Sequence, residues 1–141
     1  FVVPVRSAYS EGLYAALFAA TGEGLERLMD DCVVRPEELA ARVARALEAR
    51  GQGRSSAAAR GRVLLCGETS CLENLRDQAQ AAGWRVLGGH DEIPAGALAE
   101  CAWRRLAAGQ FWRTAAQIHS AAPLYLRASD PELKLRRRSA T

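Results

Sequence analysis

The sequence contains few of the residues from which catalytic and metal sites are built. It has one lysine and two histidines, and aromatic residues make up 6% of its 141 residues. Its four cysteines form no Cys-x-x-Cys pair, and the two histidines are far apart in the sequence. Because zinc sites need closely spaced pairs of these ligands, we expect neither a bound metal nor a cofactor.

Long hydrophobic runs and a secretion signal are also missing. No apolar run approaches the roughly 18 residues that a membrane span needs, so we expect no contact with a membrane. Without a signal sequence, the chain is expected in the cytoplasm with reduced thiols. Cys66 ends an apolar run, which favours a buried structural thiol over a nucleophile. Because the first residue is Phe1 and not Met, we expect a processed product or a piece of a longer protein.

A continuous basic surface is not indicated either. The chain has 19 basic and 16 acidic residues. Four of the basic residues lie close to the C-terminus, namely Lys134, Arg136, Arg137 and Arg138. Without these four, 15 basic residues stand against 16 acidic ones, so the excess of positive charge belongs to the end of the chain. We expect residues 129–141 to form a flexible, solvated basic tail, and contact with RNA phosphates is the alternative.

What the sequence does contain is enough apolar material for one domain. Hydrophobic residues make up 49% of the chain, which suffices for a core without a disulfide or a metal. We therefore expect a single domain over residues 1–128. Within it, residues 51–61 are rich in Gly, Ser, Ala and Arg without periodicity, which predicts a surface loop.

The apolar patterns predict eight elements of secondary structure. Three strands and a helix are expected first, at residues 1–6, 13–20, 25–34 and 36–50. A strand, a helix, a strand and a helix are expected next, at residues 62–66, 70–82, 84–88 and 94–108. The order β-β-β-α-β-α-β-α predicts an α/β fold with a mixed sheet. It is the order of a ribonuclease H-like lobe of the actin, Hsp70 and sugar-kinase (ASKHA) type.

Two prolines carry positional information. Pro4 interrupts the first strand, and because proline cannot donate to a strand ladder it indicates an edge strand or an irregularity. Pro36 suits the first position of a helix. In that helix Leu39, Val43 and Leu47 recur on one face, which predicts that this face is buried.

The turn between the strand at 62–66 and the following helix is a candidate anion site. The backbone N–H groups at a helix N-terminus bind anions, and the residues concerned are Gly67, Glu68, Thr69 and Ser70. Ser70 and Glu73 match a capping box, with Ser70 as the N-cap. The alternative is a tight turn closed by this ordinary cap, since a phosphate-binding loop with its lysine is absent from the sequence.

Three acidic residues could converge at the ends of the predicted strands. Glu11, Glu68 and Asp91 are the carboxylates that a metal-dependent nuclease site would need, but solvated loop acids are the favoured interpretation. Ser70, His119 and Asp91 supply the composition of a catalytic triad, but nothing in the sequence activates the serine. We therefore predict no catalytic residue.

Aromatic residues gather late in the chain. Trp103 lies about one turn from Leu98 and from Leu106, which favours core packing. Phe111 and Trp112 follow the end of that helix, where either core packing or an exposed patch that binds a partner is consistent with the pattern.

Several segments resemble the bacterial TsaB family, also called YeaZ. They are Glu11-Gly12-Leu13-Tyr14, Cys32-Val33-Val34-Arg35-Pro36-Glu37, Leu64-Leu65-Cys66-Gly67 and Pro123-Leu124-Tyr125-Leu126-Arg127. The resemblance spans nearly the whole chain but only the C-terminal half of the family. It implies that Tyr14 matches the family tyrosine and that Tyr125 and Arg127 fix the closing strand. Ser7-Ala8-Tyr9 stands where the family usually has Asp-Ala-Arg.

The resemblance implies a non-catalytic accessory subunit of tRNA threonylcarbamoyladenosine synthesis. Proteins of this family pair with a TsaD-like catalytic subunit and with a TsaE-like ATPase, and they reach tRNA indirectly through the complex. The family's fold is similar to that of the glycoprotease family, without its metal-binding histidines. A homodimer, a nucleotide-binding ASKHA-type enzyme lobe and a stand-alone interaction domain stay open as alternatives.

Overall fold

The computed structural model describes residues 1–8, 12–22, 24–49, 61–89 and 91–109 of the chain. The chain divides into two units, Phe1–Asp91 and Glu92–Thr141. None of the helices in the described ranges has the length and apolar character needed to cross a bilayer.

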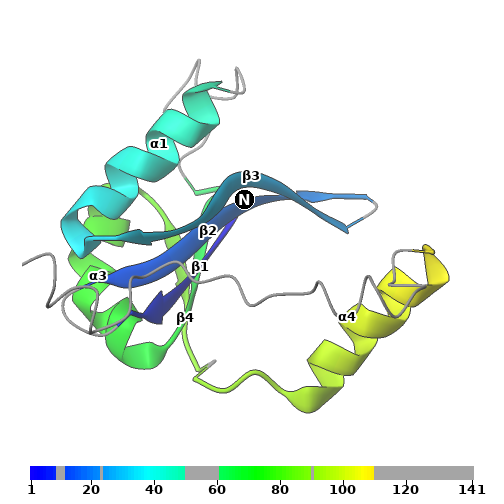
Figure 1. The fold of residues 1–141 in the computed structure, drawn as a ribbon. Coiled ribbons are helices and arrows are strands. Elements are labelled where there is room, and N and C mark those ends of the chain that lie inside the picture. The colour runs from blue at the N-terminus through cyan, green and yellow to red at the C-terminus, as the bar shows by residue number, and fades with distance from the viewer. Residues whose placement is uncertain (9–11, 23, 50–60, 90, 110–141) are drawn as a thin grey trace, which may run out of the picture. The chain divides into compact units, whose positions relative to one another are not determined.

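A mixed sheet of five strands, in the order β3-β2-β1-β4-β5, runs through the first unit (Figure 1). The strands are β1 (Val2–Ser7), β2 (Leu13–Thr21), β3 (Gly24–Val34), β4 (Leu64–Gly67) and β5 (Arg85–Leu87). Strands β1, β2 and β3 pair antiparallel, whereas β4 runs parallel to both β1 and β5. The predicted α/β class and mixed sheet are confirmed, with strand ends shifted by a residue or two.

Pro4 lies in the central strand of this sheet, so the predicted edge position is wrong. Strand β1 pairs with β2 on one side and with β4 on the other (Figure 1). The pairing with β2 passes from Val2–Phe18 to Val5–Ala15, and Pro4 lies between these two positions. A central strand can hold a proline there because the ladder does not need its missing N–H at that point. The expected irregularity is present, and the expected edge is not.

Strand β3 forms one edge of the sheet and contains extra residues relative to β2. Ala15 faces Cys32, but Leu17, two residues further along β2, faces Met29, three residues away on β3. Such β-bulges bend an edge and weaken its capacity to pair with another strand. Charged residues on the same strand have a similar effect, and they are Glu26, Arg27, Asp30 and Asp31.

The helices of the first unit bury their apolar faces in a single core. A short 3₁₀ helix (Pro36–Glu38) leads into α1 (Leu39–Ala49), and α3 (Thr69–Ala81) connects β4 to β5. Pro36 stands at the start of the first of these helices, as predicted. The predicted burial of α1 is confirmed at Leu39, Val43 and Leu47. These side chains belong to one cluster with Val3, Val5, Leu13, Leu17, Leu65, Leu72, Leu75 and Ala79.

The opposite face of the sheet carries the alternate residues of the same strands. Val2, Pro4 and Leu64 are half-buried there, as is Tyr14. Tyr14 is paired with Arg6 on β1 and with Val33 on β3. Tyr14 is thus part of the sheet, and its contact with a partner stays a prediction.

The second unit contains helix α4 (Ala95–Ala107), which follows Pro94. The predicted helix is confirmed, and Gly109 has the positive φ of 72° that suits the residue beyond a helix end. Leu98 and Trp103 are exposed, with 69% of the Trp103 surface accessible. The predicted core position of Trp103 is therefore wrong, because no residue of α4 is buried.

Several predictions lie outside the described residues. They concern most of the loop at 51–61, the tail at 129–141, and Glu11, Phe111, Trp112, His119, Tyr125 and Arg127. Gly61, the last residue of that loop, is described, and its N–H donates to the carbonyl oxygen of Gly83 at 2.6 Å.

Candidate functional site

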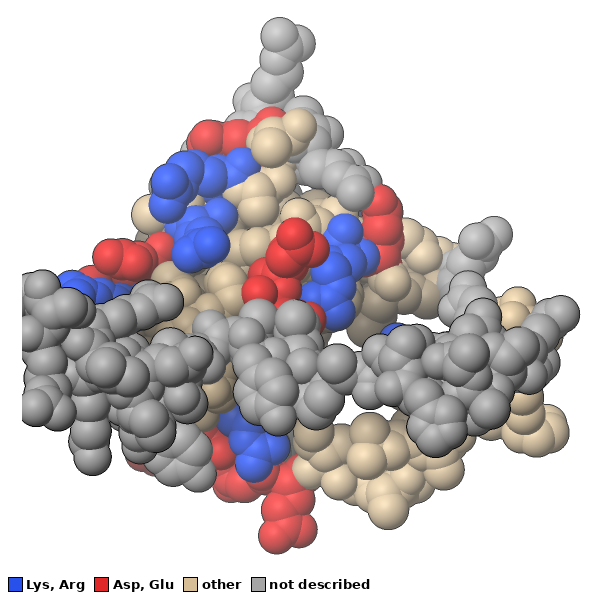
Figure 2. All heavy atoms as spheres, in the orientation of Figure 1, with Lys and Arg blue, Asp and Glu red and all other residues tan. Residues whose placement is uncertain are grey.

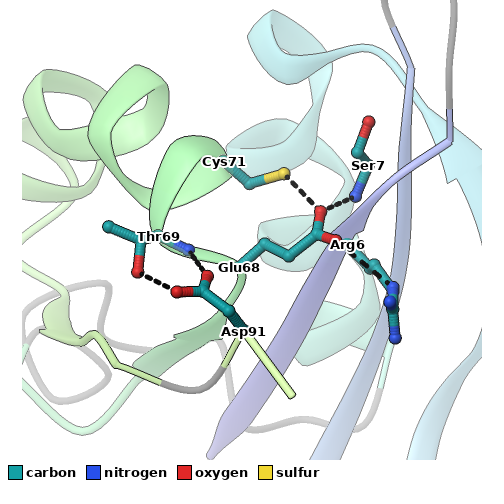
Figure 3. Close-up of polar contacts among 6 residues, drawn as sticks. All are labelled: Arg6, Ser7, Glu68, Thr69, Cys71 and Asp91. Atoms are coloured by element: carbon teal, nitrogen blue, oxygen red, sulfur yellow. Dashed lines mark hydrogen bonds and ion pairs between the residues drawn. The ribbon is translucent and has the colours of Figure 1, made fainter.

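Among the described residues, polar contacts are concentrated where β1 and β4 end at the same edge of the sheet. These strands are parallel neighbours, and Val5 faces Gly67 in their register. Strand β1 has an antiparallel neighbour on its other side, so the chain connections diverge between β1 and β4. In open α/β sheets, ligands bind beyond the carboxyl ends of the strands at such a position. The residues drawn in Figure 3 occupy it, and we call them the β1–β4 junction: Arg6, Ser7, Glu68, Thr69, Cys71 and Asp91.

Gly67 brings the two strand ends into close contact. Its φ is +144°, a conformation that side chains rarely adopt. A Cβ atom added at Gly67 would overlap the carbonyl oxygen of Val5. The next residue, Glu68, donates its backbone N–H to the same oxygen at 3.4 Å. Only glycine therefore fits between β4 and β1 at this position.

The Glu68 side chain connects the β4–α3 turn to the end of β1. Its Oε2 accepts a hydrogen bond from the backbone N–H of Ser7 at 2.8 Å. Its Oε1 forms an ion pair with Nε of Arg6 at 3.3 Å. Both contacts come from β1 and are visible in Figure 3. Both oxygen atoms of the Glu68 carboxylate thus already have partners within the chain.

Asp91 occupies the N-terminus of helix α3. Its Oδ1 accepts the backbone N–H of Thr69, and its Oδ2 accepts the Thr69 hydroxyl at 2.9 Å. Figure 3 shows the carboxylate facing the first residue of the helix. A negative charge here is favourable because the N-terminal end of the helix dipole is positive. Asp91 therefore acts as an N-cap from a distant part of the sequence.

The predicted capping box of Ser70 and Glu73 is wrong. Helix α3 begins at Thr69, its N-cap residue is Glu68, and the Glu68 side chain makes no capping hydrogen bond to the helix backbone. Ser70 thus lies inside the first turn and not before it. The physical reason is that Asp91 supplies the acceptor that a capping serine would have provided. The C-terminal prediction is confirmed, because Gly83 has a φ of 70° just beyond the helix.

The two thiols near the junction are protected from ionisation. Cys71 donates to Oε2 of Glu68 at 3.5 Å. Burial and then the Glu68 carboxylate raise the pKa of the Cys71 thiol. Burial alone raises the pKa of the Cys66 thiol. Since the thiolate is the nucleophilic form, both residues are suited to structural roles. Cys66 is half-buried, however, and not fully buried as predicted.

An external anion at the α3 N-terminus would meet two carboxylates. Thr69 N–H is bonded to Asp91, and Glu68 lies directly before the helix. An anion would have to displace Asp91 and approach the charge of Glu68. The geometry thus favours the tight-turn interpretation of residues 67–70 over the anion site. Within the described ranges, no three residues of the His, Cys, Asp and Glu types gather as they would around a metal ion.

The structure brings Glu68 and Asp91 to the same junction, but their carboxylates serve different partners. Glu11 and His119, the other members of the predicted nuclease and triad sets, lie outside the described residues. The sequence reasoning missed Arg6, Ser7 and Cys71. Their positions in the sequence could have identified them, because Arg6 and Ser7 end the first strand and Cys71 lies in the first turn of α3.

Positive and negative charges are mixed on the surface, in line with the similar numbers of basic and acidic residues in the sequence. In Figure 2, basic and acidic side chains alternate over the described part of the face shown, without a continuous patch of one sign.

A scan against protein-family models and a search of curated proteins gave no match for this chain.

Proposed function

We propose that this chain is a ribonuclease H-like lobe of an accessory subunit in tRNA threonylcarbamoyladenosine synthesis. The observation that carries the proposal is the sheet order β3-β2-β1-β4-β5, reached by three antiparallel strands followed by two parallel ones. This is the topology that the TsaB-like motifs imply. Two of those motifs border the β1–β4 pair, since Tyr14 lies on β2 and Gly67 ends β4.

The contacts at the β1–β4 junction support a structural role over a catalytic one. The Glu68 carboxylate holds the end of β1, and the Asp91 carboxylate caps α3. The nucleotide-binding alternative needs a carboxylate that can hold Mg²⁺ near the phosphates. Both described acids at the junction are instead committed to backbone N–H groups. The proposed mechanism is therefore binding: the subunit stabilises a TsaD-like catalytic partner.

The partner can be tested by copurification. The complete product of the gene that encodes this chain should be coexpressed with a TsaD-like protein, one of them tagged, and passed through an affinity column and then size exclusion. The proposal predicts a stable complex at equimolar ratio. Soluble, folded proteins that elute separately would overturn it and leave the stand-alone interaction domain as the better interpretation.

A junction variant separates folding from binding in this assay. Cys71→Ala removes a buried core thiol whose hydrogen bond goes to Oε2 of Glu68, and because alanine is a small apolar replacement the variant should fold and still copurify. If Cys71→Ala abolished the complex while leaving the melting temperature unchanged, the junction would be part of a binding or catalytic surface, contrary to the structural role proposed for it.

A further inference from the structure

Strand β5 is the least buried strand of the sheet. It has three residues, Arg85–Leu87, and it lies at the end of the sheet order of the described residues. All three are exposed, with Val86 at 42% and Leu87 at 46%. Leu65, which faces Val86 on β4, is fully buried by contrast. Because apolar burial is the main favourable contribution to folding, β5 adds little stability of its own.

The chain is held by several contacts where it enters β5. Trp84 packs against the core cluster, and its backbone N–H donates to the carbonyl oxygen of Ala79 at 2.8 Å. The backbone N–H of Arg85 donates to the carbonyl oxygen of Val63 at 2.9 Å. All of these contacts precede Val86 in the chain. They therefore hold the start of β5 and leave its end to other contacts.

The chain is held by a side chain where it leaves β5. Two glycines follow Leu87, and Gly89 has a φ of +85° with nothing within 4 Å of an added Cβ. The Asp91 carboxylate then accepts the backbone N–H and the hydroxyl of Thr69, at the start of α3 (Figure 3). The boundary between the two units of the chain lies directly after Asp91. The Asp91–Thr69 contact thus fixes the last residue of the first unit.

The strands of the sheet differ in what opposes their opening. Separating β5 from β4 exposes little new apolar surface, because Val86 and Leu87 are already exposed. Separating β1 or β2 would expose core residues such as Val3 and Leu17, which are fully buried. Local opening occurs where few buried apolar contacts oppose it. The hydrogen bonds of Asp91 are therefore a large part of what holds the end of β5 in place.

We propose that the Asp91–Thr69 contact is a latch that holds the end of β5 on the sheet. When these hydrogen bonds break, residues 86–89 separate from β4 while the core of the first unit stays folded. The connection to α4 begins directly after Asp91, so the same event frees the start of that connection. The latch is a conformational device, and it does not depend on the function proposed above.

Amide hydrogen exchange of the isotope-labelled 141-residue chain, followed by NMR at low urea concentrations, tests the latch. The reporter is the amide of Leu87, which faces β4 because N–H directions alternate along the strand from Arg85. It should exchange faster than the amides of β1 and β2 and depend less on urea, since a local opening exposes little surface. Asp91→Ala should speed its exchange about fivefold, the usual effect of losing a helix cap. Thr69→Val removes one of the two hydrogen bonds and should speed it less.

Val43→Ala is the matched control. Val43 is buried in α1 and takes no part in the latch, so this variant lowers the stability of the whole unit instead. It should speed the exchange of amides that need global unfolding and change the Leu87 rate by less than about twofold.

Equal acceleration of Leu87 exchange by Val43→Ala and Asp91→Ala would overturn the latch, because β5 would then open only with the whole unit. An unchanged Leu87 rate in Asp91→Ala would overturn it as well. If Asp91→Ala fails to fold, Thr69→Val keeps the test valid, and an unchanged Leu87 rate in that variant counts against the proposal in the same way.

Discussion

Gly67→Ala should destabilise the chain strongly, because the substitution acts at the contact between two neighbouring strands. Gly67 sits where β4 ends beside Val5 of the central strand. An added Cβ would meet the Val5 backbone and not a flexible side chain. Relief therefore requires the two strands to separate, which would also disturb the hydrogen bond from Ser7 N–H to Glu68.

The expected cost has two parts. Holding a non-glycine residue at a φ of +144° costs about 1–3 kcal/mol. Overlap with a neighbouring backbone adds about 1–3 kcal/mol. The sum of about 2–6 kcal/mol is a large fraction of the stability of a small domain, which is about 5–15 kcal/mol.

Urea unfolding followed by far-ultraviolet circular dichroism measures this cost, and two other glycines serve as controls. Gly24 has the same φ of +144° but nothing within 4 Å of an added Cβ, so Gly24→Ala isolates the backbone term. Gly22 has neither a positive φ nor a close neighbour, so Gly22→Ala should leave stability nearly unchanged. The predicted order of destabilisation is Gly67 first, then Gly24, then Gly22. Equal losses for Gly67→Ala and Gly24→Ala would refute the close contact with Val5.

Four further predictions concern the β1–β4 junction and the cysteines. Asp91→Ala should lower the free energy of unfolding by about 1 kcal/mol, because α3 loses its cap. Asp91→Asn should lower it less, because asparagine keeps an acceptor oxygen. Paired urea titrations would show whether the two variants differ. Arg6→Ala should cost less than about 1 kcal/mol, since its side chain is 58% exposed, and a larger loss would contradict this. Cys66 and Cys71 have pKa values raised above 9.0 by burial, so their contribution to stability is complete below about pH 9 and decreases as the pH rises through the raised values. Titrations between pH 8 and pH 11 should show this loss, and a double Ala variant should reduce its slope; an unchanged slope would exclude these thiols as its source. Iodoacetamide at about pH 8 should modify exposed Cys101 before half-buried Cys66 and buried Cys71, as read by peptide mass spectrometry. Simultaneous modification of all three would contradict this difference in exposure.

Local patterns in the sequence predict most of the secondary structure because each depends on neighbouring residues. The spacing of Leu39, Val43 and Leu47 predicts a buried helical face, and the three are buried. Gly83 predicts the end of a helix, and its φ of 70° fits that role. The spacing of apolar residues along a helix and the tolerance of glycine for positive φ both depend on residues within about one helical turn. Both can therefore be recognised from the sequence alone.

Long-range contacts set the details that sequence patterns miss. Asp91 caps α3 from 22 residues away, so the nearby Ser70 and Glu73 are not needed for capping. Pro4 lies in a central strand because the pairing with β2 is interrupted beside it, which depends on β2 and not on Pro4. Trp103 lies one turn from Leu106, and both are exposed, because amphipathic spacing does not fix what covers a helical face.

Rescue of tRNA modification tests the central proposal most directly. The complete gene product should be expressed in bacteria depleted of their own TsaB-family protein, and threonylcarbamoyladenosine should be measured by mass spectrometry of digested tRNA. The proposed function predicts that the modified nucleoside returns, and that Cys71→Ala restores it as well as the parent does. A soluble, folded product that associates with the host TsaD-like subunit but leaves the tRNA unmodified would contradict the proposed role.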